Sequence, residues 1–148
     1  MTVYRQHRDE VIEWLKGLDL DLFVTFNANR QTTLPKLKRD IAAWFGRIDR
    51  AALGRNWVKK TGQRALGVGF FEHFHSNLHC HVMMRMPQGG KALTKSDMMV
   101  TWRELCAPGQ LHVERARSLG AVASYVTKGL ASREAQDAFF LASEWHNR

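Results

Sequence analysis

The chain has 148 residues, of which 45% are hydrophobic and 24% charged, so we expect one folded domain with a buried core rather than a disordered chain. No apolar run approaches the ~20 residues that cross a bilayer, and the first ten residues do not read as a signal peptide, so no membrane partner is expected. The formal charge of +8 favours a polyanionic partner, most simply nucleic acid, although many small basic proteins bind none.

The first predicted elements are a helix, a strand and a second helix. Residues 5–18 carry apolar side chains at helical spacing, and residues 20–27 alternate apolar and polar side chains as a strand does. Thr33 is the expected N-cap of a long helix with one apolar stripe, which runs to about Ala52 and ends at Gly54.

The middle of the chain predicts three more strands and a third helix. We expect a short strand at residues 56–60 and a β-hairpin within residues 68–86. Thr94 and Asp97 have the spacing of a capping box, which begins a helix extending through Cys106.

The remaining pattern predicts one strand and two helices. Residues 110–114 alternate as a fifth strand, residues 118–128 form a short helix, and a last helix starts at Ser132. The expected fold is therefore α+β, with an antiparallel sheet of about five strands and helices packed mainly on one face. Residues 1–148 are expected to form a single domain. Cys80 and Cys106 lack the spacing of a disulfide framework or a zinc finger, which fits a reducing cytoplasm.

The hairpin predicts a metal site. With a turn at Ser76–Asn77, Glu72 pairs with His81, and the alternation of side chains places Glu72, His79 and His81 on one face, with Thr25 and Asn27 from the first strand. Paired residues have Cβ atoms ~5 Å apart, so one carboxylate and two imidazoles could bind one ion. Alternatively, a His-x-His pair is only a polar face near water, and Glu72 a solvated edge residue.

A second pair of residues suggests a nucleophile. Tyr125 and Lys128 are three residues apart on a predicted helix and so share a face. A tyrosine beside an ammonium group ionises more easily, and a phenolate can attack phosphorus. In the alternative interpretation, Tyr125 packs in the core and Lys128 interacts with the helix C-terminus.

Three motifs occur in the order found in a known family: Phe23-Val24-Thr25-Phe26-Asn27, His79-Cys80-His81, and Tyr125-Val126-Thr127-Lys128. In these motifs, over residues 20–130, the chain resembles the HUH endonucleases. This family includes the rolling-circle replication initiator (Rep) proteins of small single-stranded DNA viruses, phages and plasmids, with relaxases and single-tyrosine transposases as relatives.

The resemblance implies an RRM-like or ferredoxin-like HUH nuclease fold that binds Mg²⁺ or Mn²⁺ through His79, His81 and Glu72. Tyr125 would attack a phosphodiester of single-stranded DNA, leaving a 5′-phosphotyrosyl enzyme and a free 3′-OH that starts rolling-circle replication. Lys128 would position the nucleophile and the phosphate.

The resemblance also divides the chain into an N-terminal helix (1–19), a catalytic core (20–130) and a C-terminal helix (131–148). The ~20 residues after Lys128 are too few for a helicase domain, so a separate helicase from the host, plasmid or phage is expected. The expected location is the cytoplasm of a bacterium that carries the plasmid or phage.

Three alternatives remain open at this stage. A single-tyrosine transposase would use the same site on transposon ends. A non-catalytic RRM-like module would bind nucleic acid through aromatic residues on its open sheet face and would have no use for a metal. A cupin-type oxygenase also uses His-x-His, but its β-barrel contains few helices. Candidate DNA contacts are basic residues and two aromatic residues of the hairpin: Arg30, Lys59, Lys60, Arg64, Arg85, Arg115, Phe70 and Phe74.

Overall fold

The computed structural model describes residues 19–73, 76–116 and 139–142, together with Glu10, Glu13 and Gly17. Its elements in chain order are β1 (Leu22–Asn27), α2 (Leu34–Leu53), the 3-10 helices η1 (Trp57–Lys59) and η2 (Thr61–Gln63), β2 (Leu66–Glu72), β3 (His79–Arg85), α3 (Lys95–Leu105), β4 (Gln110–Arg115) and β5 (Phe139–Leu141).

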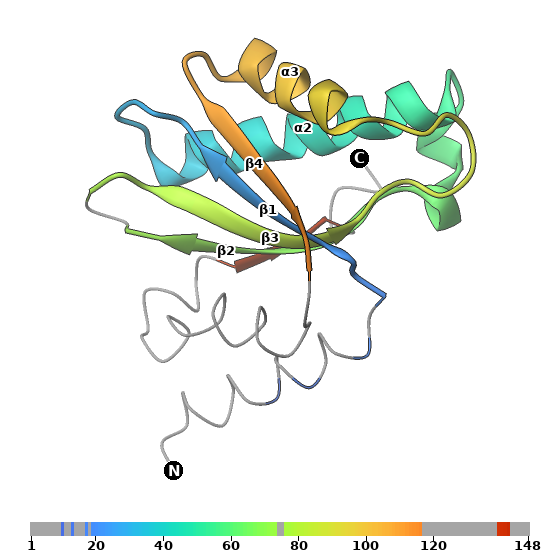
Figure 1. Ribbon diagram of the computed structural model, residues 1–148, viewed down its shortest axis with the longest axis horizontal. Coiled ribbons are helices and arrows are strands. Elements are labelled where there is room, and N and C mark those ends of the chain that lie inside the picture. Colours follow the sequence, from blue (N-terminus) through green and yellow to red (C-terminus); the bar gives the residue numbers. More distant parts are fainter. Residues whose placement is uncertain are drawn as a thin grey trace.

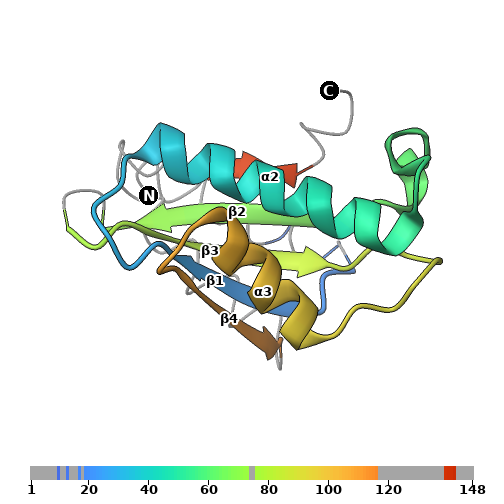
Figure 2. The same ribbon diagram turned by 90° about the horizontal axis from the view of Figure 1, so that it is seen from above.

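The strands form one sheet in the order β4-β1-β3-β2-β5, and every neighbouring pair is antiparallel. Four of the strands have six or seven residues, whereas β5 has only three. Helices α2 and α3 lie side by side over the same face of this sheet (Figures 1 and 2). The predicted α+β class, with its antiparallel sheet, is therefore confirmed for the described elements.

The main core lies between the sheet and the two helices. It contains Val24 and Phe26 of β1 and Cys80, Val82 and Met84 of β3, packed against the apolar stripe of α2. These strand residues alternate in sequence, so their neighbours project from the opposite face of the sheet. The opposite face therefore carries Phe23, Thr25 and Asn27 of β1, His79 and His81 of β3, and Glu72 of β2.

Both long helices begin at the residues that the sequence predicts. Thr33 caps α2 by accepting a hydrogen bond from the Lys36 N–H, and Gly54 follows its last residue with a φ of 83°. Thr94 and Asp97 form a reciprocal capping box at the start of α3. These caps satisfy N–H groups that a helix start leaves without partners.

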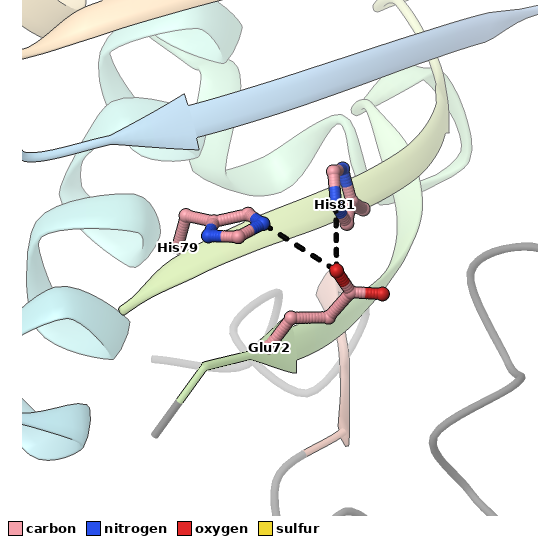
Figure 3. A group of neighbouring side chains, drawn as sticks. All are labelled: Glu72, His79 and His81. Atoms are coloured by element: carbon pink, nitrogen blue, oxygen red, sulfur yellow. Dashed lines mark ion pairs between the residues drawn. The ribbon is translucent and has the colours of Figure 1, made fainter. Parts of the chain in front are cut away.

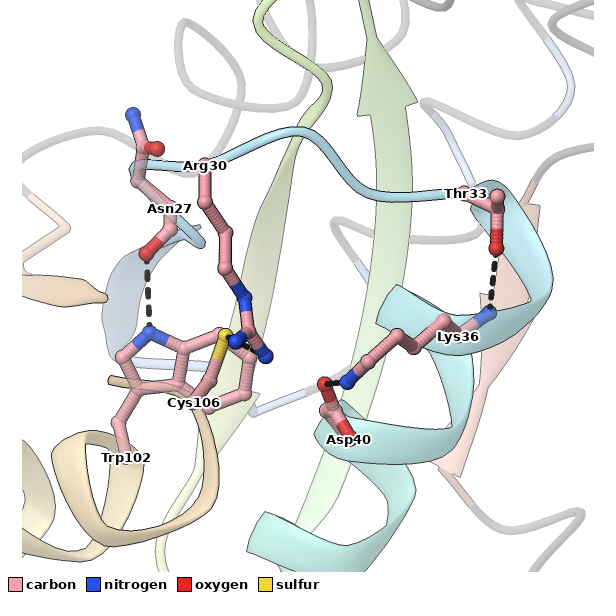
Figure 4. Close-up of polar contacts among 7 residues, drawn as sticks. All are labelled: Asn27, Arg30, Thr33, Lys36, Asp40, Trp102 and Cys106. Atoms are coloured by element: carbon pink, nitrogen blue, oxygen red, sulfur yellow. Dashed lines mark hydrogen bonds and ion pairs between the residues drawn. The ribbon is translucent and has the colours of Figure 1, made fainter. Parts of the chain in front are cut away.

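The end of β1 is fixed to α3 through a tryptophan. The Trp102 indole Nε1–H donates to the backbone oxygen of Asn27 over 3.1 Å, and Arg30 points its guanidinium toward Cys106 Sγ at 3.9 Å (Figure 4). A second indole, that of Trp44 in α2, donates to the Met98 oxygen over 3.0 Å. Both indoles are fully buried in the core, where they hold α2, α3 and the end of β1 together.

Two predictions about secondary structure are wrong. The strand expected at residues 56–60 is absent: this segment forms η1 and leads into η2. The last predicted helix is contradicted at residues 139–141, which form β5 and pair with Val68 to Phe70 of β2. The predicted helices at 5–18 and 118–128 lie outside the described residues, apart from Glu10, Glu13 and Gly17. No helix in the described part of the chain has the length and apolar character needed to cross a bilayer.

Candidate metal centre

The hairpin places the three expected ligands on one face, but in a different register from the predicted one. Glu72 pairs with His79 rather than with His81, and His81 pairs with Phe70. The predicted turn centre was one residue too far along the chain, which shifts the pairing by two residues. A shift of two keeps the same side chains on the same face, because the side-chain period of a strand is also two.

The ligand atoms of Glu72, His79 and His81 lie within 4.8 Å of one another (Figure 3). Glu72 Oε2 is 3.5 Å from His79 Nε2 and 3.3 Å from His81 Nε2. Both distances exceed the ~2.7–2.9 Å of a charge-assisted hydrogen bond. Ligand atoms that share one ion at about 2.1 Å are roughly 3.0–3.4 Å apart, so each of these two distances is close to that of a carboxylate and an imidazole on one cation.

Hydrogen bonds at the far ring nitrogens orient both imidazoles. His79 Nδ1 lies 3.0 Å from the Asn77 backbone oxygen, and because a carbonyl only accepts, this bond requires a proton on Nδ1. In the neutral ring, the Nε2 lone pair then points at Glu72. His81 Nδ1 lies 3.1 Å from Thr25 Oγ1 of the neighbouring strand. A metal-binding histidine usually has such a second hydrogen bond.

The third ligand has an oxygen available for a cation. Glu72 Oε1 is buried and has no hydrogen-bond partner in the described part of the chain. Leaving a buried carboxylate oxygen without a partner costs about 1–3 kcal/mol or more. Oε2 faces the two histidines, so a cation there would offset that cost if the carboxylate bound it through both oxygens. The residues present therefore fit a divalent ion.

Surrounding residues shield the centre from water. The side chains of Glu72, His79 and His81 are only 12%, 13% and 8% exposed. The Phe23 ring stacks on His81 with centroids 5.3 Å apart. Cys80, between the two histidines, projects into the main core, and burial raises the pKa of its thiol well above the ordinary value. Cys80 therefore stays a neutral, hydrophobic residue.

Sequence reasoning missed two contributors to this site. His73 stacks on His79, with centroids 5.1 Å apart, but it follows β2 with a φ of +58°, so strand alternation does not place it. The Asn77 carbonyl depends on the loop conformation, in which Asn77 itself has a φ of +40°. Only the turn-forming character of Asn77 was visible in the sequence.

The structure corrects two candidate DNA contacts. Arg64 is 3% exposed and paired with Asp49 at 2.8 Å, and Phe70 is 3% exposed, so neither is displayed on the surface. Phe74 lies outside the described residues. Tyr125 and Lys128 also lie outside them, so their proximity to the metal centre remains a prediction.

No protein-family model, no curated protein and no solved structure matches this chain. The fold and the metal centre therefore carry the functional argument.

Proposed function

We propose that this protein is a metal-dependent endonuclease of the HUH type, which nicks single-stranded DNA through Tyr125 and thereby starts rolling-circle replication. The observation that carries the proposal is the convergence of Glu72, His79 and His81 on the sheet face opposite α2 and α3. Mg²⁺ or Mn²⁺ is the proposed ion. The two imidazole nitrogens make Mn²⁺ the better probe, because Mg²⁺ prefers oxygen ligands.

The sheet order supports a tyrosine that works beside these ligands. β4 and β5 lie at opposite edges of the sheet, and the ligand-bearing strands β2 and β3 lie between them. Residues 117–138, which include Tyr125 and Lys128, connect these two edges. Tyr125 is nine residues from Ala116, a length of chain that spans at most ~30 Å when fully extended. Arg115 pairs with Leu22 of β1, which pairs with Met84 of β3, so Arg115 lies ~10 Å from Met84, and His81 is three residues, ~10 Å, further along β3. Nine residues can cover this separation, which is compatible with Tyr125 acting at the metal centre.

In the proposed reaction, Glu72, His79 and His81 hold the ion, which when bound would neutralise charge on a phosphate oxygen. Tyr125 gives up its phenolic proton and attacks the phosphorus atom of the scissile phosphodiester. The P–O3′ bond breaks, and the leaving 3′ oxygen takes up a proton. Lys128 favours the ionised phenolate and contacts the phosphate. The products are a 5′-phosphotyrosyl enzyme and a free 3′-OH.

Burial on the sheet face argues against the RRM-like binding module. Such a module stacks bases on exposed aromatic side chains. Here Phe70 is buried, and the partly buried Phe23 ring stacks on His81. Phe23 thus packs on a candidate ligand, and Phe70 is too buried to offer a platform for bases.

The direct test is formation of a covalent adduct with single-stranded DNA. The protein is mixed with a random pool of oligonucleotides and Mn²⁺, then resolved on a denaturing gel. Wild-type protein should give a DNA-shifted band, and Tyr125→Phe should give none. The chain has one other tyrosine, Tyr4, so Tyr4→Phe is the matched control and should keep the adduct. An adduct that persists in Tyr125→Phe would exclude the proposed nucleophile.

The metal ligands are tested in the same assay with a control from the same sheet face. His79→Ala combined with His81→Ala should abolish the adduct. His112→Ala should retain it, because His112 lies on β4 opposite Thr25 with its side chain 70% exposed. Full activity in the double variant would remove the metal centre from the reaction.

A further inference from the structure

A second pocket lies between α2 and η1, on the helical side of the sheet and away from the metal centre. It has a volume of about 450 Å³ and is lined by three small residues and four large ones: Ala42, Ala43, Gly46, Arg47, Arg50, Trp57 and Arg64. Small-molecule sites typically have volumes of about 300–1,000 Å³. The metal centre does not use any of these residues.

Three small residues of α2 line one side of the pocket. Ala42 and Ala43 lie three to four residues before Gly46, about one helical turn, so the three form a strip of minimal side chains. The Trp57 ring stands next to this strip, and Arg64, fixed by its ion pair with the buried Asp49, lies 4.7 Å from the ring centroid. The Arg64 guanidinium covers one face of the indole and holds the ring in place, so a planar group in the pocket would contact the rest of the ring.

Gly46 is unexpected in the interior of a twenty-residue helix. Glycine lowers helix stability relative to alanine, because it loses more conformational freedom on folding. A Cβ at this position would come no closer than 3.5 Å to Trp57 Cη2, which is an ordinary contact. Packing within the protein therefore does not require glycine here. A ligand in the pocket would require it, because a side chain at this position would take up part of the space.

The rim of the pocket is cationic and lacks a strong counter-charge. Among the residues that the structure describes, no acidic residue lines it. Arg47 is 3.5 Å from Glu104, but both side chains are more than half exposed, so water screens this pair. Arg50 forms no ion pair with the described residues. Two guanidinium groups that extend from one helix suit a phosphate, which arginine binds with paired hydrogen bonds.

We propose that this pocket binds a nucleoside monophosphate unit, with the base against Trp57 and the small-residue floor and the phosphate on Arg47 and Arg50. The unit is either a free nucleotide or one residue of a DNA strand. This site is separate from the metal centre, and the inference does not rest on the endonuclease proposal.

The test is a titration of the full chain with dAMP, in which NMR follows the indole N–H resonance of Trp57, assigned with Trp57→Phe. We expect a saturable shift. Arg50→Gln should weaken binding at least tenfold, while the matched control Arg39→Gln, an exposed arginine of α2 outside the pocket, should not. Gly46→Leu should fill the pocket and abolish binding while leaving the protein folded, with a Tm no lower than that of wild type. The double substitution His79→Ala/His81→Ala should leave binding unchanged.

Titrations with the two halves of the nucleotide and with a short DNA strand complete the test. Deoxyadenosine alone and inorganic phosphate alone should each bind more weakly than dAMP. Competition by the tetranucleotide d(A)4 would identify a DNA strand as the source, and its absence would identify a free nucleotide. The proposal is overturned if dAMP gives no saturable shift, if phosphate alone binds as tightly as dAMP, or if Arg39→Gln weakens binding as much as Arg50→Gln.

Discussion

Among the individual residues, Thr25 links the first strand to the metal centre. It lies on β1 directly opposite His81 and holds the ring through Nδ1, while Phe23 covers the same imidazole. The three candidate ligands lie on β2 and β3, and the neighbouring strand β1 contributes the residues that hold the His81 ring. A residue that never contacts the ion can in this way determine how well it binds.

We expect Thr25→Val to lower Mn²⁺ affinity by about 10–100-fold, because the loss of Oγ1 leaves the His81 ring without this orienting hydrogen bond. Thr25→Ser keeps the hydroxyl and should restore most of the affinity. Isothermal titration calorimetry of the two variants measures the difference. Equal affinities for Thr25→Val and wild type would show that the hydrogen bond does not tune the site.

At the scale of elements, the close approach of α2 to the sheet depends on Gly67 in β2. A Cβ at this position would come within 3.0 Å of Phe45 Cζ and 3.2 Å of Val82 Cγ1. Both neighbours are buried in the core, so neither can move without disturbing others. The missing side chain thus sets the separation between the helix and the strand that carries Glu72.

Gly67→Ala is expected to destabilise the protein by about 1–3 kcal/mol through overpacking. Gly62→Ala is the matched control, because nothing lies within 4 Å of a Cβ at that exposed position. Urea denaturation with a shared m-value measures both effects. If the two variants are equally stable, the helix can move away from the sheet at little cost.

The start of α3 gives stability that depends on pH. The Thr94 N–H donates to the Asp97 carboxylate, and this bond holds the pKa of that carboxyl below its ordinary value. The ionised carboxylate is therefore favoured in the folded state. Its contribution is present above the unfolded pKa of about 3.9 and is lost as the pH falls through the lower folded pKa.

Asp97→Ala should consequently lower Tm at pH 6, and its difference from wild type should shrink as the pH is reduced toward 3. Glu104→Ala removes an exposed carboxylate from the same helix without touching the cap and should change Tm less. Thermal unfolding followed by circular dichroism across this pH range is the measurement. A difference that stays constant with pH would show that the charge of Asp97 plays no part in the cap.

The sequence predicts elements well where local signals agree, as at Thr33 and Gly54 for α2 and at Thr94 and Asp97 for α3. It fails at residues 56–60 because Trp57 and Val58 are the only apolar residues there, and Val58 remains 43% exposed. A strand at residues 56–60 could have paired with the outer edge of β2. That edge pairs instead with β5, which comes from far along the chain. Pairing between distant segments is a tertiary effect that local pattern does not encode.

The common face of the three candidate ligands was predictable for a different reason. Their common face depends only on the side-chain period of two, which survived the error in the turn. Their exact pairing and the bonds from Asn77 and Thr25 depend on loop conformation and on strand order. The loop conformation and the strand order cannot be read from the residues of the hairpin alone.

At the scale of the whole molecule, the sheet separates two chemically different sides. Glu72 and the two histidines project from one face, and the helices with the arginine-lined pocket cover the other. Substitutions on the outer surface of α2 should therefore alter ligand binding there without changing the metal centre.

The positions of β4 and β5 at opposite edges have a kinetic consequence. Both ends of the connection that contains Tyr125 are held by the same sheet as the ligands. A short covalent tether gives an effective concentration on the order of millimolar, well above the micromolar protein concentrations of an assay. If Tyr125 is the nucleophile, as we propose, the tyrosine of a chain should therefore react at the metal of that same chain, and not at the metal of another molecule.

A mixing experiment checks this consequence. Tyr125→Phe retains the metal ligands, and the double substitution His79→Ala/His81→Ala retains the tyrosine. A mixture of the two proteins should form no more DNA adduct than either protein alone. Recovery of the adduct on mixing would mean that one molecule lends its tyrosine to another, and that the catalytic unit is an exchanged dimer.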